Sequence, residues 1–165
     1  MLQLITKYSI DTSSLINMKD NYPHDIFEKL WNNIEIMINL QRLIAPVIVK
    51  KEIDKGYDIL KEWANQHNNM FIKIDIPIQE KFRQICAKIK SLNLDVHFAI
   101  DTNPYAQADL WVIALAMREN NLVTKCSVIS DENPNKPAKI PGICKLFGIN
   151  CFNTFDFFRN ENWKF

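Results

Sequence analysis

Four separate stretches of the sequence carry an acid that follows or opens an apolar run. The acids are Asp11, Glu52, Asp109 and the pair Asp131 and Glu132, and the runs beside them cover residues 4–10, 47–49, 110–117 and 128–129. An ionised carboxylate close to a core is costly unless hydrogen bonds, a cation or a metal compensate its charge. If these acids converge, they repel one another, and a divalent cation between them would remove that repulsion.

The donor types indicate which cation and which reaction to expect. A site built only from oxygen ligands favours hard ions such as Mg²⁺ or Mn²⁺. Such ions polarise a phosphoryl oxygen, lower the pKa of a bound water and stabilise the leaving oxygen. His24, His67 and His97 lie outside these stretches, so a histidine base or a Ser-His-Asp triad is unsupported. The pattern therefore predicts hydrolysis of a phosphodiester by a metal-activated water.

Each acid also has an ordinary structural explanation. Asp11 and Asp109 are placed to cap helices, and Glu52 suits the positive end of a helix dipole. A cap does not explain why Asp11 adjoins a central strand or why Asp109 opens a helix that is apolar almost all round. We favour a functional role for these two, while Glu52 gains weight only from the other acids. Of Asp131 and Glu132, one is expected to face the site.

Two further polar residues lie near these acids. Ser13 follows Asp11 by two positions, where it could orient a carboxylate or hold a metal-bound water, or serve only as a cap. Asp101 precedes Asn103 and Pro104, and we interpret it as a turn residue.

The elements that must position the acids alternate along the chain. Strands are expected at residues 4–10, 45–49, 71–76, 127–130 and 149–153, and helices at residues 25–42, 50–66, 78–92, 109–120, 142–147 and from 154 onward. Such alternation predicts a parallel sheet covered on both faces. Ligands bind such sheets beyond the carboxyl ends of the strands, at a switch in strand order. The fold class therefore predicts a convergence of the acids that the linear sequence does not display.

Composition narrows the function classes. The 165 residues predict one domain spanning 1–165, with 47% hydrophobic residues and a formal net charge of +1. A nucleic-acid contact would therefore need a local basic patch. With three glycines, the chain has no phosphate-binding P-loop and no dinucleotide turn. The apolar stretches are too short to span a bilayer, and no signal leader is evident, so we expect a cytoplasmic protein without a membrane partner.

The ordered set of motifs resembles the PIN-domain nucleases, including the VapC-like toxins of toxin–antitoxin pairs. The matching stretches are residues 8–16 around Asp11, 49–53 around Glu52, 108–116 around Asp109 and 128–132. Closer still, the chain resembles a PIN-like family of unknown function in Glu62-Trp63-Ala64, the loop at residues 139–144 and the closing stretch at residues 148–153. The match spans nearly the whole chain.

The resemblance implies an α/β fold: a three-layer α/β/α arrangement whose central parallel sheet has the order 3-2-1-4-5. It implies Mg²⁺ or Mn²⁺ held by Asp11, Glu52, Asp109 and a fourth acid, and cleavage of single-stranded RNA. It also implies frequent homodimers and, in toxin members, an antitoxin that plugs the site. The usual fourth element is a hydroxyl residue, any residue and then an acid. Laid on Ser130-Asp131-Glu132, this makes Glu132 the acid, although the usual acid is Asp and Asp131 stays open.

Lysines near the acids are the candidates for RNA contacts. Lys50 and Lys51 precede Glu52, and three more follow the fourth acid, namely Lys136, Lys139 and Lys145. They could hold phosphates or be solvated surface residues. The aromatic residues near the end of the chain favour burial in the core or a dimer interface over stacking on bases.

These observations favour a Mg²⁺- or Mn²⁺-dependent endoribonuclease, the toxin of a toxin–antitoxin pair, acting on single-stranded or structured RNA. The alternative is a PIN-like binding module with weak or no catalysis. A phosphatase or flap nuclease on a related fold is a third possibility. The phosphatase is disfavoured because Ser13 stands where an aspartyl-phosphate enzyme needs a second Asp. The flap nuclease is disfavoured because the chain lacks the long insertions expected for threading flap DNA.

Overall fold

The computed structural model describes residues 4–56, 58–94 and 108–165. Within them, a parallel sheet has the strand order β3-β2-β1-β4-β5, which confirms the expected order 3-2-1-4-5. The strands are β1 (Ile5–Ile10), β2 (Leu43–Pro46), β3 (Phe71–Ile72), β4 (Thr124–Ile129) and β5 (Cys151–Phe152). The switch in strand order therefore falls at β1, the strand that Asp11 follows.

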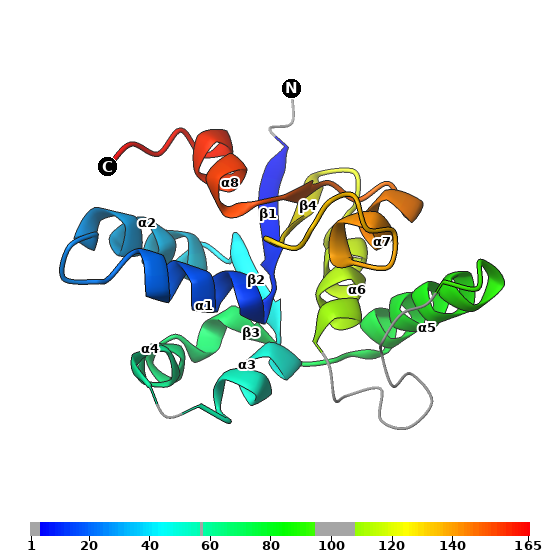
Figure 1. Cartoon of the computed structure of the whole chain (residues 1–165), viewed down its shortest axis with the longest axis horizontal. Helices are drawn as coiled ribbons and strands as arrows, with labels where there is room; N and C mark the ends of the chain where they lie inside the picture. The colour runs from blue at the N-terminus through cyan, green and yellow to red at the C-terminus, as the bar shows by residue number, and fades with distance from the viewer. Residues whose placement is uncertain (1–3, 57, 95–107) are drawn as a thin grey trace.

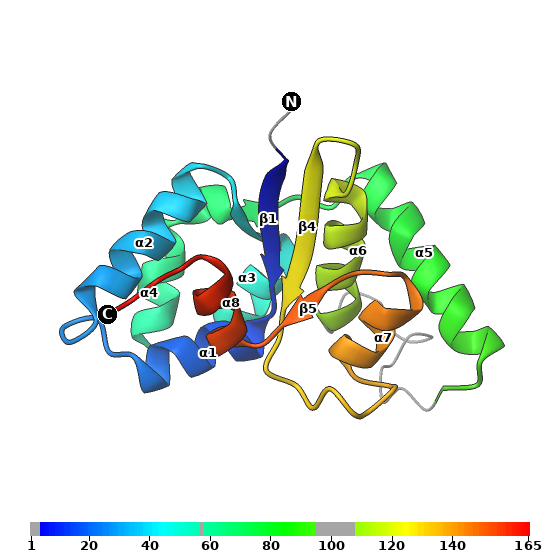
Figure 2. The ribbon, with the colours of Figure 1, turned by 90° about the horizontal axis from the view of Figure 1, so that it is seen from above.

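Helices cover both faces of this sheet and make it a three-layer α/β/α fold (Figures 1 and 2). On one face lie α5 (Ile76–Ser91), α6 (Asp109–Glu119) and α7 (Ile140–Leu146). On the other lie α1 (Thr12–Asn21), α2 (Glu28–Asn39), α4 (Ile59–Gln66) and α8 (Thr154–Asn160). A short helix, α3 (Val47–Ile53), continues directly from β2, and a 3₁₀ turn, η1 (Asn68–Met70), precedes β3.

The centre of the core lies between β1, β4 and α6. β1 and β4 pair in parallel from Ile5 opposite Thr124 to Ile10 opposite Ile129. Helix α6 is buried along nearly its whole length, as an almost uniformly apolar helix must be. The hydroxyl of Ser9, on β1, donates to the carbonyl of Val112 at 2.8 Å, which fixes α6 against the central strand. This packing sets where the first residue of α6, Asp109, lies relative to the end of β1.

Two sequence expectations are wrong around β2. The pattern predicts a strand that includes residues 47–49, but the strand ends at Pro46 and Val47 begins α3. Short buried apolar runs suit a strand and a buried helix equally well, so their pattern does not distinguish the two. The single helix expected at residues 50–66 is also two helices. Helix α4 starts anew after Asp58, whose carboxylate accepts hydrogen bonds from the backbone N–H groups of Leu60 and Lys61.

The aromatic residues near the end of the chain are mainly core residues, as expected. Phe157 and Phe158 are buried, and the ring of Phe157 packs edge-on against Tyr8 of β1 with centroids 4.8 Å apart. Phe155 and Phe165 are exceptions, because they are 61% and 53% exposed. The ring of Phe155 lies beside a pocket described below.

The described residues include no helix that is long and apolar enough to cross a membrane. The four cysteines form no disulfide. The predictions for Asp101 and His97 lie outside the described residues.

Candidate active site

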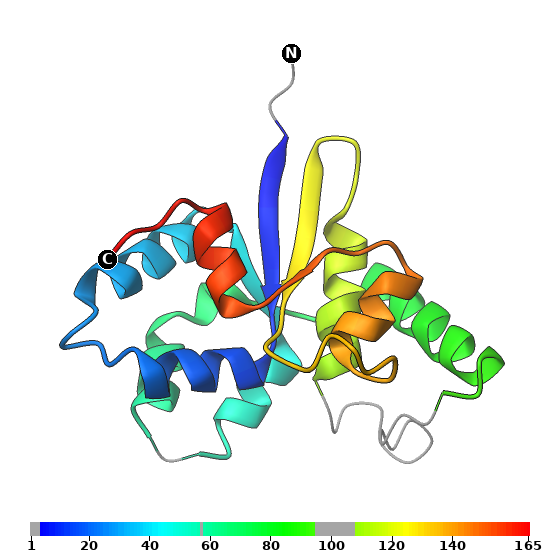
Figure 3. The ribbon, with the colours of Figure 1, turned by 45° about the horizontal axis from the view of Figure 1, so that its top comes forward.

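The segments that carry the predicted acids meet at the carboxyl edge of the sheet. The start of α1, the start of α6 and the end of β4 all lie at this edge (Figure 3). The pKa of Asp109 is raised to about 7, first by burial and then by the charges of Glu132, Asp11 and Glu52. We call these four residues the acidic cluster. They follow one another at intervals of 41, 57 and 23 residues, the differences between their sequence numbers, so the parallel sheet produces their convergence.

Asp11 is the most deeply placed of these acids. Only 1% of it is exposed, and it caps α1 by accepting a hydrogen bond from the backbone N–H of Ser14 at 2.7 Å. Its second carboxylate oxygen accepts a hydrogen bond from the hydroxyl of Ser130 at 3.0 Å. Burial raises the pKa of Asp11 to about 6, and these hydrogen bonds partly oppose the rise. Asp11 is therefore both a helix cap and a member of the acidic cluster.

Glu52 joins three segments through one carboxylate. One oxygen accepts a short hydrogen bond from the hydroxyl of Thr12, at the start of α1. The other accepts from the backbone N–H of Ala108, directly before α6, at 3.0 Å. Glu52 is thus held by Thr12 and Ala108. The expectation that it opens a helix is wrong, because it lies in the last turn of α3.

Asp109 differs from the other acids of the cluster in its hydrogen bonding. It is the first residue of α6, and its carboxylate accepts no hydrogen bond from any residue that the structure describes. It is partly buried, and its charge is opposed by three neighbouring acids. A carboxylate in these surroundings is the member of the cluster most in need of a cation.

The side chains of Asp131 and Glu132 point to different surroundings. Glu132 accepts hydrogen bonds from the backbone N–H of Ile140 and from the ammonium of Lys139, both at 2.9 Å. Its charge raises the pKa of both Asp11 and Asp109. Asp131 instead accepts hydrogen bonds from the backbone N–H and the hydroxyl of Thr154, at 2.8 and 2.6 Å. The geometry places Glu132, and not Asp131, in the acidic cluster.

The serines around Asp11 do not all take the places that the sequence suggested. Ser13 is exposed, and its hydroxyl makes no hydrogen bond with the described residues. Ser14, which the sequence reasoning missed, is fully buried, and its hydroxyl accepts a hydrogen bond from the backbone N–H of Asp131 at 3.2 Å. The signal was its position three residues after a capping Asp, where the cap accepts its N–H. Ser130 is buried and also accepts from the N–H of Glu132 at 3.3 Å.

The ligand atoms of the acidic cluster are of the type that a hard divalent cation prefers. The four carboxylates supply only oxygen ligands, and two of them have raised pKa values that a nearby cation would lower. In the described ranges no three His, Cys, Asp or Glu side chains stand together as a ready ligand group. Glu52 and Glu132 are instead turned toward backbone N–H groups. Asp11, Glu52, Asp109 and Glu132 could hold the ion, and Asp11 and Asp109 are the two whose pKa is raised.

The predicted RNA-contacting lysines fall into two groups. Lys50 pairs with Asp54 at 2.6 Å, and Lys139 pairs with Glu132 at 2.9 Å. The other three are exposed and form no ion pair with the described residues: Lys51, Lys136 and Lys145. Within the part of the chain that the structure describes, these three have ammonium groups available for a phosphate.

Comparisons with known proteins agree with this architecture. The structure is similar to DNA-bound VapBC from Salmonella typhimurium, with a TM-score of 0.56 and 18% sequence identity over 90% of this chain and 98% of that chain. It is also similar to VapBC2 from Rickettsia felis bound to a DNA fragment from its promoter, with a TM-score of 0.52 and 14% identity over the same shares. At these identities the likeness shows the fold alone, and it confirms the PIN-like fold.

A search of the curated proteins finds no match to this sequence. The model of one family, described as a domain of unknown function (DUF4411), matches residues 8–165. The chain therefore belongs to the DUF4411 family, and its fold is that of the PIN domain.

Proposed function

We propose that this protein is a Mg²⁺- or Mn²⁺-dependent endoribonuclease that hydrolyses phosphodiester bonds of single-stranded RNA. The observation that carries the proposal is the group of four carboxylates at the switch point of the sheet, two of which have raised pKa values. Structural acids are usually paired with cations or hydrogen-bond donors. Asp109 has no such donor among the described residues, which is more readily understood in a site that binds a cation.

The residues of the chain divide into ligands and groups that hold them. Asp11, Glu52, Asp109 and Glu132 would hold the cation, which when bound would lower the pKa of the attacking water and neutralise charge on the scissile phosphate. Ser130 orients Asp11, and Thr12 orients Glu52, each through a hydrogen bond to one carboxylate oxygen. Such supporting contacts keep ligands in a productive geometry.

The substrate would be guided by lysines at the rim of the site. Lys51, Lys136 and Lys145 are the best candidates for phosphate contacts because their charges are not already paired within the described residues. Lys50 and Lys139 remain candidates if RNA displaces Asp54 or Glu132 from them. With a formal net charge of +1, the chain has no global attraction for RNA, so these local charges would set the salt dependence.

A toxin role, with a cognate antitoxin, belongs to the same proposal. The two solved structures described above are VapBC assemblies, and an antitoxin segment that reaches the carboxyl edge would cover the acids. A homodimer and a cytoplasmic location are further parts of it. Expression of the chain with and without the product of an adjacent small gene, followed by growth and pull-down measurements, tests the toxin role separately from catalysis.

One observation favours the alternative of a catalytically weak binding module. The ammonium of Lys139 donates a hydrogen bond to the carboxylate of Glu132, and its positive charge lowers the pKa of Asp109. A resident lysine could thus partly replace a metal ion. The variant Lys139→Ala tests this replacement. If Lys139 competes with the metal ion, the variant should bind Mg²⁺ more tightly than wild type.

The decisive experiment is cleavage of a mixed pool of single-stranded RNA in Mg²⁺, in Mn²⁺ and in EDTA. Wild type is compared with Asp11→Asn, Asp109→Asn and the control Asp156→Asn, a half-exposed acid in the first turn of α8. We expect metal-dependent cutting by wild type and the control, and a loss of about 100-fold or more in the two site variants. Equal cutting by all four proteins, or none by wild type, would remove the nuclease assignment.

A further inference from the structure

The turn after β4 supplies the candidate site with two side chains. Ser130 donates a hydrogen bond to Asp11, and Glu132 is a member of the acidic cluster. Residues 130–139 form no helix or strand, so a regular backbone ladder does not hold them. Fixing such a segment costs conformational entropy, which individual contacts must offset. The directions of Ser130 and Glu132 therefore depend on whatever anchors this turn.

Asp131 lies between these two residues and is anchored through both its backbone and its side chain. Its backbone N–H donates to the hydroxyl of Ser14 at 3.2 Å. Its two carboxylate oxygens accept hydrogen bonds from the backbone N–H and the hydroxyl of Thr154, at 2.8 and 2.6 Å. These contacts join the turn to the first turn of α1, 117 residues away, and to the first residue of α8, 23 residues away.

Both anchors of Asp131 are fixed points of the fold. Ser14 is fully buried, and Thr154 is only 6% exposed. The backbone N–H of Ser14 also donates to the carboxylate of Asp11 at 2.7 Å. The same serine thus holds Asp11 on one side and the turn that carries Glu132 on the other, so a shift of the turn would move the two acids relative to each other.

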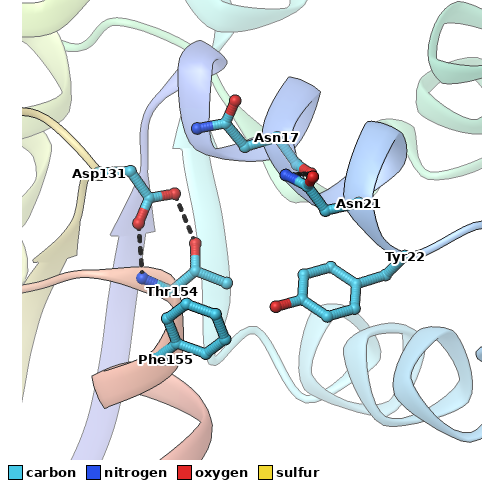
Figure 4. Close-up of a pocket in the computed structure, with 6 residues that line it drawn as sticks. All are labelled: Asn17, Asn21, Tyr22, Asp131, Thr154 and Phe155. Carbon is cyan, nitrogen blue, oxygen red and sulfur yellow. Dashed lines mark hydrogen bonds between the residues drawn. The ribbon is translucent and has the colours of Figure 1, made fainter.

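The contact between Asp131 and Thr154 lies at the surface. The pair lines one wall of a pocket of about 410 Å³ and is joined there by two hydrogen bonds (Figure 4). The other walls are formed by Asn17, Asn21, Tyr22 and Phe155. Asp131 is exposed, so truncating its side chain leaves no buried cavity, and water in the pocket can reach the donors that Thr154 would lose as partners. The contact can therefore be removed without damage to the core.

We propose that Asp131 is a positioning residue of the proposed metal site. Held by Thr154 and Ser14, it fixes the turn and with it the directions of the two side chains on either side. This inference rests on the proposed nuclease function, because it assigns a role toward the same acids. Asp131 itself contacts neither the ion nor the RNA, and supporting residues of this kind change metal affinity or activity by about 10–100-fold when they are removed.

The chemistry of the contact separates this role from that of a metal ligand. Thr154 offers a backbone N–H, which can only donate, and a hydroxyl, which can donate or accept. An asparagine at position 131 would accept from the N–H through its amide oxygen and donate its amide N–H to the hydroxyl. Asp131→Asn therefore keeps both hydrogen bonds and loses only the negative charge. A positioning residue tolerates that change, whereas a ligand to Mg²⁺ does not.

The first measurement follows the turn in metal-free protein. Amide hydrogen exchange is recorded by NMR in EDTA for wild type, Asp131→Ala and the control Asp156→Ala, which changes a half-exposed acid of α8 that does not line the pocket. After correction for intrinsic rates, the N–H groups of residues 131 and 132 should exchange about 10-fold faster or more in Asp131→Ala. The N–H of Val128, bonded to the carbonyl of Asn150, should be unchanged in both variants.

The second measurement is the affinity for Mg²⁺ by calorimetry. We expect Asp131→Ala to weaken binding by about 10–100-fold. Thr154→Val, which leaves Asp131 intact and keeps the backbone N–H, should weaken it less. Asp131→Asn and Thr154→Ser keep the paired contact and should stay within about 3-fold of wild type. Adding Thr154→Val to Asp131→Ala should cause no further loss, because the two residues act through one contact.

The outcomes separate this inference from the nuclease assignment. Unchanged exchange and unchanged Mg²⁺ affinity in Asp131→Ala overturn the positioning role even if RNA is cut. A loss in Asp131→Asn as large as that in Asp131→Ala, with Thr154→Val like wild type, also overturns it and makes the carboxylate a ligand. If wild type binds no Mg²⁺, the proposed function fails, and the exchange rates in EDTA still decide whether Asp131 holds the turn. If RNA is cut, Asp131→Ala should lower kcat and leave KM for RNA unchanged.

Discussion

The acidic cluster makes a quantitative prediction that does not depend on activity: Asp109→Asn should stabilise the metal-free protein. The pKa of Asp109 is raised from 3.8 to about 7 by burial and by three neighbouring acids. One pKa unit corresponds to about 1.4 kcal/mol, so keeping this group ionised costs the folded state about 4 kcal/mol. Asparagine removes the charge but loses a favourable interaction of about 0.3–1 kcal/mol with the N-terminus of α6.

The effect has a definite dependence on pH. Because the pKa is raised in the folded state, the protonated form of Asp109 contributes stability that is fully present below pH 3.8 and is lost as the pH rises through 7. We therefore expect Asp109→Asn to gain little near pH 4 and about 2–4 kcal/mol near pH 8. For a chain of this length the gain at pH 8 corresponds to a rise in Tm of about 5–15 °C.

The assay is urea unfolding in EDTA at pH 4, 6 and 8, with wild type, Asp109→Asn and Asp156→Asn. The control changes a half-exposed first-turn acid that pairs with Arg159, so it should lose up to about 1 kcal/mol at every pH at which that pair is charged. If Asp109→Asn is no more stable than wild type at pH 8, or if its gain does not grow with pH, the charge repulsion inferred at this edge is absent.

Three further predictions follow from other contacts of the site. Saturating Mg²⁺, at about 100 times its Kd, should stabilise wild type by about 2.7 kcal/mol, and Asp11→Asn should remove most of that gain in a thermal shift measurement. Ser130→Ala removes one of the two buried hydrogen-bond donors of Asp11 and leaves that of Ser14, so it should cost about 1–3 kcal/mol in urea unfolding. Ser13 is exposed, and Ser13→Ala should change stability by less than about 0.5 kcal/mol. Gly142→Ala would place a Cβ 2.5 Å from the carbonyl oxygen of Lys136 and should lower the free energy of unfolding by about 1–3 kcal/mol or more. Gly56→Ala, whose nearest contact would be 3.3 Å, should lower it less. Equal losses of stability in the two variants would contradict the close packing of Gly142 against Lys136.

Sequence patterns were sufficient for the architecture. Alternating apolar strands and amphipathic helices predicted the parallel sheet, whereas the strand order 3-2-1-4-5 that the structure has was implied by the resemblance to PIN-domain nucleases. The pattern failed at residues 47–49, which form the first turn of α3. A three-residue buried run carries no period, so local sequence could not distinguish a strand from a buried helix.

The acids were predictable by type but their partners were not. Apolar flanks marked Asp11, Glu52 and Asp109, because a carboxylate beside a core demands an explanation. Nothing in the linear sequence indicated that Thr12 and Ala108 would hold Glu52. That outcome depends on how α1, α3 and α6 pack.

The difference between Asp131 and Glu132 shows most clearly what the sequence predicts and what only the tertiary structure decides. The sequence placed two adjacent acids after β4, and either could have faced the cluster. In the folded chain Thr154 at the start of α8 binds Asp131, and Ile140 at the start of α7 binds Glu132. Strand and helix periods come from neighbours along the chain, whereas the direction of each carboxylate depends on which distant N–H group the fold brings beside it. This is why the residue types of the site could be predicted from the sequence, but their assignment to the acidic cluster or to the adjacent pocket required the packing of α7 and α8 against the sheet.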